Sequence, residues 1–151
     1  MKLFWLGLLL IASIQCRGQG IMSRLEEISN RSGLLQNAIY AHEAPFLESL
    51  DCKRILMYET LAQKTMMLIS TIELTEYAVM VRKEMKNKDG SWLHTRSISN
   101  LQQLPTTLRR MKIEPNQNSP LYADEMDFMK IVADLESILL QINISQPSNP
   151  K

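Results

Sequence analysis

Apolar residues recur every three or four positions over residues 21–42, and charged or amide residues occupy the positions between them. Such spacing is typical of one face of an amphipathic helix of about six turns. Gly33 lies inside the segment and weakens the helix. The predicted buried stripe, which includes two polar members, is Ile21, Leu25, Ile28, Ser32, Leu35, Ile39 and His42.

Pro45 follows this stripe, and proline is poorly tolerated inside a helix but suits its first turn. The sequence therefore predicts a break over residues 42–44 and a second helix from Pro45 to about Lys88, where a turn and Gly90 follow. That helix would be about 64 Å long. It either projects as an antiparallel or oligomeric coil, or bends at a β-branched run. The run is Ile69, Thr71, Ile72 and Thr75.

Two apolar rows on the second helix predict contact with two neighbours. The first row is Phe46, Leu50, Met57, Leu61, Leu68 and Ile72, and the second is Ile55, Tyr58, Ala62, Met66 and Ile69.

The last third of the chain is divided by prolines and by a polar turn at residues 114–119. Residues 91–103 have a mixed pattern. A short helical stretch could be lined by Leu93, Ile98, Leu101, Leu104 and Leu108, but Pro105 divides it. We therefore expect a loop and then a short helix over residues 105–112. Ser119 is a good N-cap for a final helix, with Pro120 at its first position. Leu121, Phe128, Val132, Leu135, Leu139 and Ile142 follow a seven-residue pattern with one gap. Residues 143–151 are expected to be disordered.

These segments define an all-α fold, an antiparallel helical bundle with one long central helix. It has three main helices and one short helix, and forms a single domain over residues 19–142.

Residues 1–18 have the features of a secretory signal peptide, namely Lys2, an apolar run to Ile14 and small Gly18 at the end. Cleavage is expected after Gly18, which places the mature protein in the periplasm or outside the cell. An uncleaved anchor is one alternative, and a lipid on Cys16 is another, although Gln15 does not suit lipidation. No later segment is long enough to span a membrane.

Amino-acid composition and net charge exclude several classes of function. The chain is 45% hydrophobic and 22% charged, with formal charge +1; loss of Lys2 and Arg17 with the leader leaves 15 basic and 16 acidic residues. This balance excludes a disordered acidic tail and gives no electrostatic basis for binding nucleic acid. The ten methionines are more typical of an irregular core than of an adaptable binding surface, although Met66 and Met67 face different directions.

The mature chain is poor in catalytic groups, with His42, His94 and Cys52 as its only histidines and cysteine. We expect no metal, no cofactor and no enzymatic activity, since nothing activates Cys52 and His42 is expected in a loop. The acidic pairs Glu73/Glu76 and Asp124/Asp127 are expected on solvated helix faces.

Cys52 has no internal disulfide partner once the leader is removed. It is either a buried apolar residue, which we favour, or one half of an intermolecular disulfide. If the source is eukaryotic, Asn30 and Asn143 lie in glycosylation sequons.

The leader's end, residues 16–19, is similar to the leaders of exported Bacteroidetes proteins. Residues 119–129 resemble part of the helical periplasmic proteins of conjugative-transfer operons. This resemblance covers eleven residues and implies a non-catalytic helical component of a transfer apparatus; it assigns no functional residue. The expected partners are other proteins, with self-association as one form.

A signal peptide, the chain's size, its helix count and its sequons also resemble short helical cytokines. That likeness implies a secreted signalling ligand instead. The missing internal disulfide is a departure from such ligands.

Overall fold

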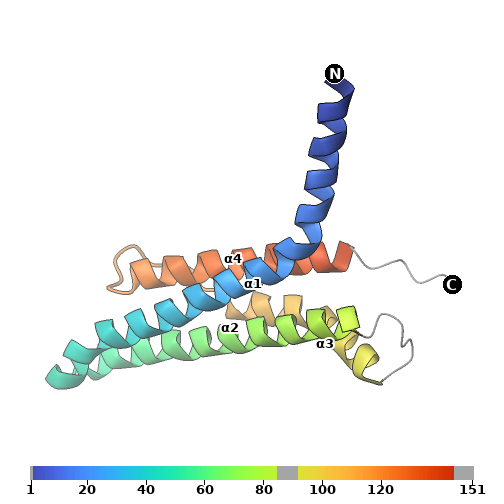
Figure 1. The fold of residues 1–151 in the computed structure, drawn as a ribbon. Helices are drawn as coiled ribbons and strands as arrows, with labels where there is room; N and C mark the ends of the chain where they lie inside the picture. Colours follow the sequence, from blue (N-terminus) through green and yellow to red (C-terminus); the bar gives the residue numbers. More distant parts are fainter. Residues whose placement is uncertain (1, 85–91, 145–151) are drawn as a thin grey trace.

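The computed structural model describes residues 2–84 and 92–144, with four α-helices and no strand among them (Figure 1). These are α1 (Lys2–Ser49), α2 (Cys52–Glu84), α3 (Trp92–Met111) and α4 (Tyr122–Ile144). The predicted all-α class is therefore confirmed. α1 packs against α2 and α4, and α2 packs against α3.

The break predicted at residues 42–44 is wrong, because α1 continues through Pro45 to Ser49. The chain turns at Leu50, whose φ is 55°. The backbone N–H of Leu50 donates to the carbonyl of Leu47 (3.3 Å), and that of Asp51 donates to Phe46 (3.1 Å). This pair of bonds is a Schellman motif with leucine at the position that usually holds glycine.

Asp51 then caps the N-terminus of α2, because its Oδ1 accepts from the backbone N–H of Arg54 at 3.3 Å. α2 continues from Cys52 without interruption past the β-branched run, so neither the bend nor the start at Pro45 is observed. The predicted stop at residues 87–90 lies outside the described residues.

α3 also corrects the sequence-based expectation. It extends over Trp92–Met111 with Pro105 inside it, where we expected a loop and then a short helix. The reason lies in packing: Leu101, Leu104 and Leu108 are all buried at helical spacing. Their burial outweighs the backbone hydrogen bond that Pro105 removes.

Ser119 makes the predicted capping contact, but α4 begins at Tyr122 and not at Pro120. The Ser119 hydroxyl accepts from the backbone N–H of Leu121 (3.1 Å), and the Ser119 carbonyl accepts from Tyr122 (3.1 Å). The polar turn before it is confirmed, and Glu125 stabilises it by accepting from the N–H of Asn116 at 3.0 Å. α4 extends to Ile144, two residues into the predicted tail, and residues 145–151 lie outside the described residues.

The core lies between the helices, and the predicted stripe of α1 faces it. Leu25, Ile28, Leu35 and Ile39 are buried, as is Ser32, whose hydroxyl donates back to the Ile28 carbonyl (2.7 Å). The other two members are less buried, since Ile21 is only partly covered and His42 is exposed. From α2, α4 and the turn before α4, the largest fully buried side chains are Leu68, Ile72, Leu121, Phe128, Ile131, Leu135, Ile138 and Leu139.

The first part of α1 projects away from the other helices (Figure 1). This part contains residues 2–18, so the cleavage site after Gly18 stays a prediction. Among the described residues, no helix combines the length and the apolar character that a membrane span requires.

Candidate functional site

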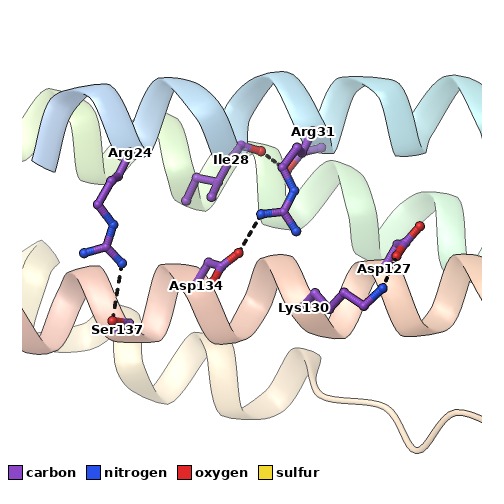
Figure 2. Close-up of polar contacts among 8 residues, drawn as sticks. Arg24, Ile28, Arg31, Asp127, Lys130, Asp134 and Ser137 are labelled. Atoms are coloured by element: carbon purple, nitrogen blue, oxygen red, sulfur yellow. Dashed lines mark hydrogen bonds and ion pairs between the residues drawn. The ribbon is translucent and has the colours of Figure 1, made fainter. Parts of the chain in front are cut away.

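A row of polar contacts joins α1 to α4 along their exposed edges (Figure 2). Arg24 donates to Gln141 at 2.8 Å, and Arg31 pairs with Asp134 at 2.6 Å. As the residue numbers rise along α1 they fall along α4, so the two helices run in opposite directions. Both arginine contacts are at least partly open to water and contribute little to stability.

The third contact of this row is different, because Asp124 is buried. Nδ1 of His42 donates to Oδ2 of Asp124 at 2.8 Å, and the two side chains are 55% and 8% exposed. Asp124 lies three residues after Leu121 and four before Phe128, so it is on the buried side of α4. Its position in the first turn also suits a negative charge.

Both expectations for these residues were therefore wrong: His42 is on a helix, and Asp124 is not on a solvated face. The available signal was the spacing of Asp124 from Leu121 and Phe128, which places it on the same helix face as both.

Aromatic and charged side chains meet near this pair, at the end of the α1–α2 hairpin. The rings of Phe46 and Tyr58 stack with centroids 5.6 Å apart, and Arg54 lies 4.9 Å from the Phe46 centroid. Burial, followed by the charge of Asp124, raises the pKa of Tyr58, while Arg54 opposes this shift. These contacts join the end of α1 to the beginning of α2.

Two polar side chains of α1 are buried without a hydrogen-bond partner for some of their atoms. These atoms are the amide oxygen and nitrogen of Gln36 and Oε1 of Glu43, which is 2% exposed. Burial, and then the charge of Glu59, raises the pKa of Glu43. Buried polar atoms without a partner cost stability.

A groove of about 320 Å³ lies between α1 and α4. Arg31 and two aspartates line it, and they already form ion pairs or hydrogen bonds with His42, Lys130 and Asp134. No group of three or more metal-ligating side chains occurs within the described residues.

Cys52 is exposed at the beginning of α2, which corrects the favoured expectation that it is buried. Its thiol is free in the structure, and the intermolecular disulfide stays a prediction. Of the two histidines that could have met it, His42 pairs with Asp124, and the His94 side chain is outside the described part of the chain.

The two sequon asparagines both lie on helices. Asn30 is exposed on α1, and Asn143 belongs to the end of α4, with its side chain outside the described part. Glycosylation of Asn30 and Asn143 stays a prediction.

The most unusual surface is the outer face of α2, which we define by six exposed apolar residues. The exposed fractions are Leu56 67%, Met66 55%, Met67 54%, Leu74 46%, Tyr77 47% and Met80 48%. The expected core role is therefore wrong for Met66, Met67 and Met80. Methionine on an open helix face forms adaptable contacts with apolar partners.

No protein family, curated protein or solved structure matches this chain in sequence or structure comparisons.

Proposed function

We propose that this chain is an exported, non-catalytic helical protein that acts through contacts with other proteins. In this proposal its antiparallel bundle is a rigid support for the outer face of α2. An accessory subunit of a cell-envelope transfer or secretion assembly is the role that fits best. The proposal includes no cofactor and no nucleic acid.

The observation that carries the proposal is the exposure of the outer face of α2. Eleven large hydrophobic residues are exposed among the described residues, and six of them lie on this one helix. Contiguous apolar surface on a soluble protein is typical of a site of contact with another protein.

The alternative is a secreted helical ligand that resembles a cytokine. It needs the same open helix face but a receptor as partner, in a eukaryotic source that also uses the Asn30 sequon. The all-helical fold is compatible with both roles, so the identity of the partner decides between them.

Site-specific photocrosslinking in the native host tests the contact function. A photoreactive residue at Met67 should give adducts, and the same residue at Leu34, which is 70% exposed on α1, should not. Adding Leu74→Glu should abolish the Met67 adducts. Equal adducts at both positions, or none at Met67, would contradict the proposal.

Export has its own test. Placing Asp at Leu9 interrupts the apolar run of the leader and should prevent export. Ser23→Asp in the mature chain, at an exposed position of α1, is the matched control and should be exported normally. Unchanged export of the Leu9→Asp chain would overturn this part of the proposal.

A further inference from the structure

A regular seam runs along the outer face of α2. Starting at Leu56, residues at alternating steps of four and three all point outward, and seven of the eight are exposed while Val81 is half-buried. We call these eight residues the outer seam: Leu56, Thr60, Gln63, Met67, Ser70, Leu74, Tyr77 and Val81. The buried face of α2 lies on the opposite side and includes Leu61, Leu68 and Ile72.

This spacing is the repeat of a coiled coil. A helix that repeats every seven residues, in steps of three and four, matches a second helix along its whole length. The outer seam keeps the repeat for about 38 Å, and five of its eight residues are apolar. The face is therefore patterned for one long helix rather than for a small ligand.

We propose that the occupant is α2 of a second copy of this chain, packed antiparallel. The two helices are related by a twofold axis that passes between Met67 and Ser70. A seam residue that lies before the axis in one copy then faces, in the second copy, the seam residue that lies equally far after it. The facing pairs are Thr60 with Tyr77, Gln63 with Leu74, Met67 with Ser70, and Leu56 with Val81.

The sizes of these side chains favour that arrangement. Each facing pair forms one layer between the two helices. Three of the four pairs combine a large side chain with a smaller or polar one, which fills the space between the helices evenly. A parallel pair would instead place Ser70 against Ser70 and Tyr77 against Tyr77. The first layer would leave a void and the second would be overcrowded.

The charges beside the seam agree with the antiparallel pair. Glu59 and Glu73 flank the seam on one side and alternate along it with Met66 and Met80. In the antiparallel arrangement Glu59 approaches Met80 of the other copy, and Glu73 approaches Met66. No two carboxylates are opposite each other, so no like-charge repulsion opposes the contact.

The antiparallel dimer also determines how far apart the Cys52 residues of the two copies lie. In this dimer the two Cys52 residues lie at opposite ends of the paired helices, about 50 Å apart along the axis. A disulfide between them cannot join the two copies, so reductant should not change the mass of the dimer.

The inference rests on the proposed contact function and names its partner. Sedimentation equilibrium of the purified protein should give twice the mass of the chain. Leu74→Glu should weaken association at least about tenfold, since it buries two carboxylates. Leu34→Glu on α1 is the matched control and should leave the dimer intact. A monomer at all concentrations would overturn the inference but leave contact with other proteins standing, because photocrosslinking tests that separately.

Disulfide trapping determines the direction of packing in a Cys52→Ser background. A mixture of Leu74→Cys and Gln63→Cys chains should form a cross-linked heterodimer upon oxidation, and neither chain alone should do so. Cross-linking of the Leu74→Cys chain with itself would show a parallel pair and overturn the antiparallel arrangement. Helical content by circular dichroism confirms that each variant is folded.

Discussion

The imidazole of His42 and the carboxylate of Asp124, 82 positions apart in the chain, are joined by a 2.8 Å hydrogen bond. The bond links the end of α1 to the beginning of α4. The Asp124 side chain is almost fully buried, while the His42 side chain is about half exposed to solvent. A buried carboxylate needs a partner, so the histidine holds the two helices in register.

His42→Ala should therefore lower the free energy of unfolding by about 1–3 kcal/mol, because it leaves a buried carboxylate without its donor. Urea denaturation followed by circular dichroism measures this value. Arg31→Ala, which breaks the more exposed pair with Asp134, is the matched control and should cost only about 0.2–1 kcal/mol. Equal losses in the two variants would show that the burial of Asp124 has no energetic consequence.

The carboxyl of Glu43 gives the fold a pH dependence. Burial and the charge of Glu59 raise its pKa, so the folded state binds a proton more readily than the unfolded chain. Its contribution to stability is present below the ordinary glutamate range and is lost as the pH rises through the folded-state value. Glu43→Gln should therefore be more stable than the native chain at pH 7, and the difference should shrink toward pH 4.

Thermal unfolding of both proteins at several pH values measures this difference. Glu48→Gln removes an exposed carboxylate on the same helix and controls for the loss of one negative charge. The prediction fails if Glu43→Gln and Glu48→Gln follow the same pH profile. Glu76→Gln should change the pH dependence in the same direction, because burial and the charges of Glu73 and Glu26 raise the pKa of Glu76 as well.

Leu50 has a left-handed backbone, with φ of 55°, and is 78% exposed. A leucine in this conformation is strained, and its side chain gains little from packing. Leu50→Gly should raise the free energy of unfolding by about 1 kcal/mol, because glycine adopts positive φ without strain. Ser49→Gly, one position earlier in α1, is the control and should be destabilising. A loss of stability in Leu50→Gly would mean that the exposed leucine makes a contact worth more than its strain.

The sequence predicted elements whose ends and faces depend on local chemistry. The stripe of α1, whose apolar residues recur at helical spacing, and the cap at Ser119, whose contacts lie within three residues, are examples. It failed at Pro45, where α1 continues to Ser49, and at Pro105, where burial of Leu101, Leu104 and Leu108 outweighs the local preference of proline. It also failed for Met66, Met67 and Cys52, because which face of α2 is covered depends on how the other helices pack.

A substitution at Pro105 measures how much the proline destabilises α3. Pro105 lies inside α3, so it removes a backbone hydrogen bond to the carbonyl of Leu101 and strains the turn before it. Pro105→Ala should restore that bond and raise the free energy of unfolding by about 1–2 kcal/mol, since alanine's advantage of about 3 kcal/mol is partly offset by greater freedom of the unfolded chain. Denaturant unfolding measures it, and Thr106→Ala at the next, exposed position is the control. A loss of stability would show instead that α3 needs a proline kink to bury Leu101, Leu104 and Leu108 together.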